Sequence, residues 1–261
     1  MGQSLTNSPF RLILDPILTM GRFSTFMMRS IRRIFFPPLS FKLLMVQMEF
    51  VGNRSFSIIC LAGIMVGGIF GFQLGEIFRI FGSESMIGAA AGFALSRELA
   101  PLIGSFLVTG RAGSAMAAEI ATMRVNEQID AMRVMSVNPY SYLVAPRILA
   151  SMIMMPILTI FFIISGVFSS FIIGLIFYDI DVADFIGKIE WVVSPIDIIS
   201  GVEKAIVYGI IFSGIGCYQG FHASGGAKGV GKATTVAVVA SYVSILVADY
   251  LITYLQFSFD H

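Results

Sequence analysis

The sequence predicts an all-α integral membrane protein, because of its composition and the spacing of its charges. Of its 261 residues, 56% are hydrophobic and only 13% are charged. This is more apolar surface than the core of a soluble domain of this size needs. The apolar residues form five runs, each long enough to cross a hydrocarbon layer of about 30 Å as a helix rising about 1.5 Å per residue. We expect an interfacial amphipathic region over 1–54 and a five-helix transmembrane domain over 55–261.

The N-terminal region carries seven basic side chains against two acidic ones, interleaved with Leu, Ile, Met and Phe. It lacks an apolar run of spanning length and a small-residue cleavage site, so we expect no cleaved signal peptide. The pattern favours an amphipathic helix along the cytoplasmic face, broken at Pro37-Pro38, with its arginines among lipid phosphates. A mobile basic tail is the alternative.

The first expected span, 55–75, contains no charged residue. Its glycines recur at every fourth position, at Gly63, Gly67, Gly71 and Gly75. Small residues at this spacing let another helix approach closely. The partner is either a helix of the same chain or, in the bolder interpretation, a second copy.

The second expected span, 86–109, contains two adjacent ionisable residues, Arg97 and Glu98, near its middle. Each charge at that depth costs on the order of a few kcal/mol, so both must face protein, water or a polar ligand. Adjacent residues point about 100° apart on a helix and cannot easily pair with each other. They either contact a ligand or lock this helix to its neighbours.

A polar segment, 114–137, follows the second span. It is rich in the helix formers Ala, Met, Glu and Arg and ends before Asn138-Pro139, which predicts one helix outside the lipid. One face is polar and another is apolar: the first holds Glu119, Asn126, Asp130 and Arg133, and the second holds Ile120, Met123, Ala131 and Val134. We expect a cytosolic coupling helix that packs under the bundle and offers a surface to a soluble partner.

Three further spans are expected, over 148–178, 198–221 and 233–257. An acidic connector with the single Trp191 precedes the fourth span and is typical of the outer side of a membrane. Lys204 lies in the fourth span and Asp249 in the fifth. Together with Glu98 they suggest a polar network that joins three spans, a hypothesis without support from spacing.

The distribution of Lys and Arg predicts the orientation. Of 17 such residues, 13 lie in 1–54, in the segment from Arg111 to Arg147, or in the loop with Lys228 and Lys232. These regions share one side of the predicted spans, and the positive-inside rule makes that side cytoplasmic. The N-terminus is then cytoplasmic and the C-terminus lies on the outer side.

Catalytic and metal-binding patterns are lacking in the sequence. The stretch from Gly226 to Ala233 nearly matches the phosphate loop G-x-x-x-x-G-K-[ST], but Ala233 has no hydroxyl for Mg²⁺ and a membrane span precedes it. We can assemble neither a nucleophile with its base nor a ligand set at metal spacing, so we expect no enzymatic activity and no metal site. Cys60 and Cys217 lie in apolar runs and are expected to be packing residues.

A series of motifs surrounds the second span and the polar segment: Ser96-Arg-Glu-Leu-Ala-Pro101, Thr109-Gly-Arg-Ala-Gly-Ser-Ala115, Ala118-Glu-Ile-Ala-Thr-Met-Arg124, Glu127-Gln128, Val137-Asn-Pro139 and Ala145-Pro-Arg147. This series resembles the MlaE (YrbE) family, the permease subunits of MCE-associated ABC lipid transporters. The resemblance extends in order over about 40–257, whereas the first 40 residues match only in character.

The resemblance implies a homodimer in the bacterial inner (cytoplasmic) membrane, with the N-terminus cytoplasmic and the C-terminus periplasmic. A dimer of cytosolic ABC ATPases would bind ATP and Mg²⁺, so no cofactor is expected in this chain. A STAS-domain protein and a hexameric ring of MCE-domain proteins are further implied partners, and nucleic acid is not. The implied substrate is phospholipid, exchanged with the external ring to maintain outer-membrane lipid asymmetry.

Two groups of site residues follow from the resemblance by position. The expected lipid-binding residues are Phe70, Leu74, Ile77, Phe78, Phe81, Arg97, Glu98 and Leu99. The expected ATPase-coupling residues are Glu119, Arg124, Glu127, Gln128, Asp130 and Arg133, and Lys204 with Asp249 would form the polar network. A Phe-rich span beside Arg97 also suits a lipid on physical grounds, because it offers an apolar slot and a partner for phosphate.

Two other functions remain open. An ion-coupled secondary transporter would use Arg97, Glu98 and Asp249 as a relay, but it has no use for the coupling helix. A non-transporting membrane scaffold would only anchor a lipid-binding ring.

Overall fold

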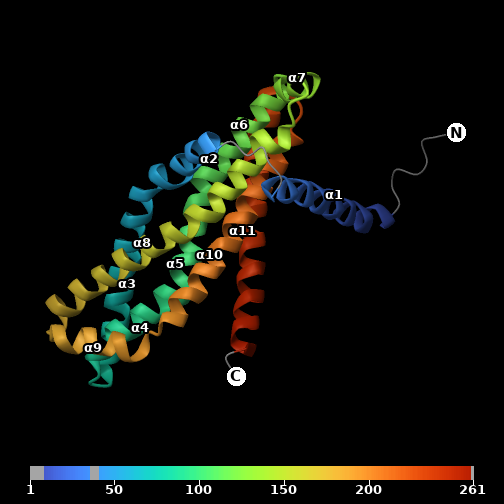
Figure 1. Cartoon of the computed structure of the whole chain (residues 1–261). Helices are drawn as coiled ribbons and strands as arrows, with labels where there is room; N and C mark the ends of the chain where they lie inside the picture. Colours follow the sequence, from blue (N-terminus) through green and yellow to red (C-terminus); the bar gives the residue numbers. More distant parts are fainter. Residues whose placement is uncertain (1–8, 36–40, 260–261) are drawn as a thin grey trace.

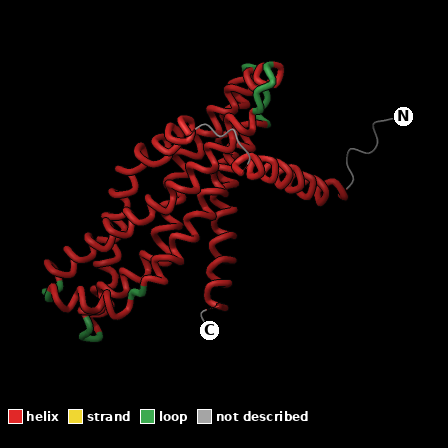
Figure 2. Tube along the Cα trace, viewed as in Figure 1, coloured by secondary structure: helices red, strands yellow, loops and turns green. Residues whose placement is uncertain are grey.

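The computed structural model describes residues 9–35 and 41–259, and all regular secondary structure in these ranges is helical (Figure 2). Five of the described segments are long and apolar enough to cross a membrane: Phe41–Ile80, Glu84–Val125, Tyr140–Phe177, Pro195–Phe221 and Gly226–Ser258. The expected all-α membrane architecture with five spans is thus confirmed.

The first span is longer than the expected 55–75. It comprises α2 (Phe41–Met48), a π-helical turn (Glu49–Asn53) and α3 (Arg54–Ile80). Lys42 and Arg54 are exposed, and long basic side chains near a helix end can reach the interface, so they do not stop the helix. The expected break at Pro37-Pro38 lies outside the described residues.

The long helices α3 and α8 (Ala145–Phe177) lie side by side (Figure 1). The glycine seam of α3 faces α8: a Cβ added at Gly67 would collide with the backbone of Gly166, and one at Gly75 with the ring of Tyr178. Such close approach requires glycine. The seam is therefore used within the chain, and the bolder interpretation, a seam between two copies, is wrong.

Helix α1 (Pro9–Phe35) projects from the side of the bundle (Figure 1). Phe23, Phe26 and Met27 pack against Tyr218 and its neighbours on α10 (Pro195–Phe221). The basic residues of the described part of the helix are exposed: Arg22, Arg29, Arg32 and Arg33. An amphipathic helix is thus present within the expected region 1–54, but it covers only Pro9–Phe35, because residues 41–54 belong to the first span. Its location along the cytoplasmic face stays a prediction.

The bundle has two distinct ends (Figure 1). One end carries α7 (Gln128–Val134), and the other carries α9 (Val182–Val192), a helix that the sequence analysis did not predict. The Asp181 side chain caps α9 by accepting a hydrogen bond from the Ala183 backbone N–H at 2.9 Å. The final helix, α11 (Gly226–Phe259), starts near the α7 end and runs toward the α9 end (Figure 1).

The coupling segment differs from the single helix expected over 114–137. The second span continues without interruption into α6 (Ser114–Val125), turns at Asn126 and Glu127, and resumes as the short helix α7. Glu127 has a φ of 56°, in the left-handed region that few residues other than glycine adopt. This turn divides the predicted polar face between two helices and leaves Val134, of the predicted apolar stripe, 86% exposed.

Candidate functional site

The second span changes its helix type where it carries its charges. Between α4 (Ile87–Ala94) and α5 (Ala100–Val108), the residues Leu95–Leu99 form a π-helical turn. Pro101 follows; it has no N–H to donate to the Arg97 carbonyl, and its ring would clash with that carbonyl in a regular α-helix. The wider turn accommodates this proline, and such turns are frequent at functional sites.

Arg97 and Glu98 both pair with side chains of α10. Arg97 Nη1 lies 3.3 Å from Asp197 Oδ1, and Lys204 Nζ lies 2.5 Å from Glu98 Oε2. Gly201 lies between these two partners, and a Cβ there would collide with the backbone carbonyl of Ser96. The two backbones therefore approach closely enough for both ion pairs to form.

Lys204 is the centre of the buried polar groups. Its side chain is 0% exposed, and its ammonium group also donates to Thr253 Oγ1 at 2.7 Å and lies 3.4 Å from Asp249 Oδ1. Tyr208 donates its hydroxyl to the same Asp249 oxygen at 2.5 Å. Burial of an ammonium group is tolerable only with such compensation.

We call these residues the polar core: Arg97, Glu98, Asp197, Lys204, Tyr208, Asp249 and Thr253. It joins the second, fourth and fifth spans and combines three carboxylates with two cationic side chains. Glu98 remains 37% exposed, whereas the side chains of Asp197 and Asp249 are 7% and 16% exposed. Glu98 is therefore the carboxylate of the polar core that a ligand can reach most easily.

Sequence reasoning placed part of the polar core but missed Asp197, Tyr208 and Thr253. Asp197 has two roles, because it also accepts hydrogen bonds from the Ser194 N–H and hydroxyl, both at 2.9 Å, in the capping box of α10. The spacing Ser194-x-x-Asp197 at a helix start was the available signal for the cap. No sequence signal indicated that the same carboxylate pairs with Arg97.

The expected lipid-binding residues of α3 do not share one environment. Leu74 and Phe78 pack against Ile87, Ile180 and Phe185, beneath α9. By contrast, Ile77 and Phe81 are 50% and 74% exposed, while Phe70 is partly buried. Leu99 is partly buried against the central apolar core beside Arg97 and Glu98.

An apolar groove that was not predicted lies between α8 and α9. Its volume is about 560 Å³, and its lining residues are Ile163, Ile164, Val167, Phe168, Phe171, Phe185, Ile186, Ile189 and Glu190. All but one of these residues are apolar, which suits a hydrocarbon chain. The groove uses α8 and α9 rather than the α3 positions expected from the sequence.

Helix α7 is fixed to α6 by ion pairs around Asp130. The Asp130 carboxylate accepts from Arg124 Nη1 at 2.7 Å and from Arg133 Nη1 at 3.0 Å. Ile129 is fully buried beneath the helix. Three of the expected coupling residues thus hold α7 in place, whereas Glu127 and Gln128 are exposed at its start.

A second ion pair joins the segment to the third span. Arg147 Nη2 lies 2.8 Å from Glu119 Oε2, and Arg147 Nη1 donates to the Leu143 carbonyl at 2.7 Å. The Arg147 side chain is only 4% exposed. Glu119 therefore contributes to a contact between α6 and α8. Its partner Arg147 could not be identified from the sequence.

The comparisons with known proteins agree with this architecture. The family described as Permease MlaE matches residues 44–255. A probable ABC transporter permease protein of Rickettsia felis is 39% identical over 97% of this chain and 98% of its own length, and one from Synechocystis is 37% identical over 81% and 80%. Protein TRIGALACTOSYLDIACYLGLYCEROL 1, chloroplastic, of Arabidopsis thaliana is 40% identical over 79% of this chain and 59% of its own length. The chain therefore belongs to the MlaE permease family.

Proposed function

We propose that this membrane permease is the lipid-moving subunit of an ATP-driven transporter. It would exchange phospholipids between the bacterial inner membrane and an external ring of MCE-domain proteins, and so maintain outer-membrane lipid asymmetry. It would act as a dimer with two cytosolic ABC ATPases that supply the ATP and Mg²⁺ chemistry, together with a STAS-domain protein. The name of the Arabidopsis relative refers to a glycolipid, which supports a lipid as the cargo.

One observation carries this proposal: a single helical segment, Glu84–Val125, joins the polar core to the end of the bundle that carries α7. We call this end the coupling end. It bears Arg97 and Glu98 within the membrane region and ends at the turn before α7. A force on α7 would move these two charges relative to Asp197 and Lys204 on α10. Packed interfaces of this kind have discrete arrangements, which suits alternation between two states.

The chemistry of the site suits a phospholipid. Arg97 offers a guanidinium group for a phosphate, and Glu98 is exposed enough to contact an amine or hydroxyl of the head group. The groove between α8 and α9 offers an apolar surface for an acyl chain. The α3 residues Ile77 and Phe81 are exposed and would contact lipid directly.

Reconstitution tests the proposal. The chain is placed in liposomes with and without its partner ATPase, and the transfer of a fluorescent phospholipid to an acceptor MCE-domain protein is followed. We expect transfer that requires both ATP and the ATPase. ATP hydrolysis by this chain alone, or transfer that follows a proton gradient and ignores ATP, would contradict it.

The polar core also supports a second candidate, an ion-coupled transporter, because Glu98 and Asp249 share one lysine. The same liposomes distinguish this candidate by their response to a proton gradient. The substitutions Arg97→Ala and Glu98→Ala test the scaffold alternative. If the chain is only a scaffold, lipid transfer and partner assembly should both be unchanged in these variants. If the chain is the transporter, lipid transfer should be lost while its partners still assemble.

A further inference from the structure

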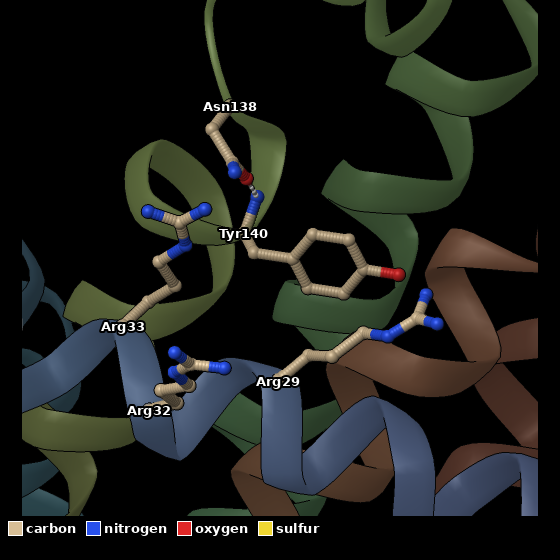
Figure 3. Close-up of a pocket in the computed structure, with 5 residues that line it drawn as sticks. All are labelled: Arg29, Arg32, Arg33, Asn138 and Tyr140. Atoms are coloured by element: carbon tan, nitrogen blue, oxygen red, sulfur yellow. Dashed lines mark hydrogen bonds between the residues drawn. The ribbon is translucent and has the colours of Figure 1, made fainter.

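A cavity of about 600 Å³ lies between α1 and the residues that follow α7 (Figure 3). On one side it is lined by Arg29, Arg32 and Arg33 of α1. On the other side it is lined by Asn138 and Tyr140, which connect α7 to the third span. Residues far apart in the sequence thus form one site at the coupling end, outside the polar core.

The cavity has a strong positive charge. The three arginines are spaced i, i+3 and i+4, which places them on one face of α1. The Asp130 carboxylate pairs with Arg124 and Arg133, and the Glu119 carboxylate pairs with Arg147. Like charges so close together on one helix face favour a bound anion.

The opposite wall is neutral and held in place. Asn138 Oδ1 accepts a hydrogen bond from the Tyr140 backbone N–H at 3.0 Å, so the amide nitrogen of the same side chain is left as a donor. The ring of Tyr140 packs against Phe26 and Phe221, with centroid distances of 5.5 and 5.3 Å. Its hydroxyl lies on the same side as the Arg29 guanidinium (Figure 3). The lining therefore presents mostly hydrogen-bond donors.

We propose that this cavity binds the phosphate group of an anionic ligand and thereby ties α1 to the segment behind α7. A phosphate accepts several hydrogen bonds and matches the fork of an arginine side chain. The apolar face of α1 packs on the bundle beside the site, so an acidic phospholipid head group on this face of the membrane is one source. A soluble phosphate compound has the same chemistry and is the other source.

The ligand would influence the coupling end directly. Arg33 also lines an adjoining cavity of about 320 Å³ with Ser136 and Val137, the last residues of the coupling segment. A phosphate bound by Arg33 and Asn138 would restrict the segment through which α7 joins α8. This role needs neither the identity of the transported cargo nor the direction of its movement.

Binding by the full-length chain in nanodiscs tests the proposal. One arm compares nanodiscs of phosphatidylcholine alone with nanodiscs that also contain phosphatidylglycerol, and reads out hydrogen exchange of residues 26–35 and 136–142. The second arm titrates inorganic phosphate and ATP into the phosphatidylcholine nanodiscs. The variants are Arg29→Gln and Arg33→Gln, and the matched control is Arg22→Gln, an exposed arginine of the same helix that does not line the cavity.

We expect protection of both segments on binding, with affinity reduced at least about tenfold by each cavity variant, because each variant removes a charged hydrogen bond, and little changed by the control. Protection only with phosphatidylglycerol identifies a lipid source, and protection by phosphate or ATP identifies a soluble one. Equal losses in Arg22→Gln and the cavity variants would reveal unspecific attraction and overturn the proposal. Absence of protection in both arms would overturn it as well. Circular dichroism of each variant verifies that the helices are intact.

Discussion

At the scale of single residues, the bundle depends on a buried lysine. The side chain of Lys204 is fully buried and contacts Glu98, Asp249 and Thr253. Its ammonium group compensates the carboxylate of Glu98 on the second span and that of Asp249 on the fifth span. Removing one member of such a group leaves an unpaired charge, which costs far more than the net contribution of the pair.

We predict that Lys204→Met destabilises the protein by about 3–5 kcal/mol, because it leaves Glu98 and Asp249 without their cation. The measurement is thermal unfolding in detergent. The control, Lys228→Met, removes an exposed lysine and should change the unfolding temperature little. Addition of Asp249→Asn to Lys204→Met should restore part of the loss. Equal unfolding temperatures for the two single variants would show that the polar core does not stabilise the bundle.

The sequence placed Arg97, Glu98, Lys204 and Asp249 in their spans and suggested that the last three form a network, which the structure shows around Lys204. It gave no partner for Arg97. Arg97 was expected to need a partner, and its partner Asp197 lies in what the sequence suggested was an outer connector. In the sequence, Tyr208 is one of several aromatic residues in an apolar run, and nothing there indicates its hydrogen bond to Asp249. Pairing depends on the rotation and the axial offset of two helices, and neither is encoded in the periodicity of one helix.

At the scale of helices, the contact between α3 and α8 requires glycine. Gly67 and Gly166 approach so closely that a Cβ at Gly67 would overlap the Gly166 carbonyl. The periodic glycines of the sequence predicted this close packing correctly. They could not predict which helix is the partner, because α8 is distant in the sequence and any small-residue face could have matched.

We predict opposite effects of one substitution at two helical glycines. Gly67→Ala should destabilise the fold by about 1–3 kcal/mol, because the added methyl group forces two backbones apart. Gly187→Ala on α9 should stabilise it by about 0.5–1 kcal/mol, because nothing lies within 4 Å of the added Cβ and alanine favours the helix. Unfolding of both variants by denaturant provides the comparison. A stable Gly67→Ala variant would contradict the packing described here.

The coupling segment, formed by α6, the turn at Asn126 and Glu127, and α7, was predicted only in part. We call it the elbow. Its position and polar composition were evident, but the turn at Asn126 and Glu127 was not, since Glu is a good helix former and rarely adopts a positive φ. The burial of Ile129 and the ion pairs of Asp130 hold this conformation. They are tertiary contacts, which override local helix propensity.

We predict that Glu127→Lys weakens ATPase binding about tenfold without unfolding the bundle, the effect of losing about 1.4 kcal/mol at an interface. Glu127 suits this test better than Asp130, because Asp130 also holds α7 in place. Co-purification of the partner ATPase is the measurement. Asp184→Lys, the same charge reversal on an exposed residue of α9, is the control. Unchanged co-purification with Glu127→Lys would exclude this residue from the coupling surface.

At the scale of the whole molecule, charge differs between the two ends of the bundle. The α7 end carries the arginines of α1 and of the elbow, whereas the α9 end carries Asp179, Asp181, Asp184 and Glu190. This asymmetry could be predicted from the sequence, because it depends only on the number of charged residues in each segment between the spans. From this asymmetry the positive-inside rule predicts that the α7 end is cytoplasmic.

We predict that single cysteines at the two ends react from opposite sides of the membrane. In spheroplasts, a membrane-impermeant maleimide should label Asp184→Cys directly and Glu127→Cys only after permeabilisation. The unmodified chain is the control, because its Cys60 and Cys217 lie within the first and fourth spans. Both substituted positions are exposed, so failure to label after permeabilisation would not follow from burial in the fold. Labelling of Glu127→Cys in intact spheroplasts would show that the protein has the opposite orientation. A cytosolic ATPase could then not contact α7.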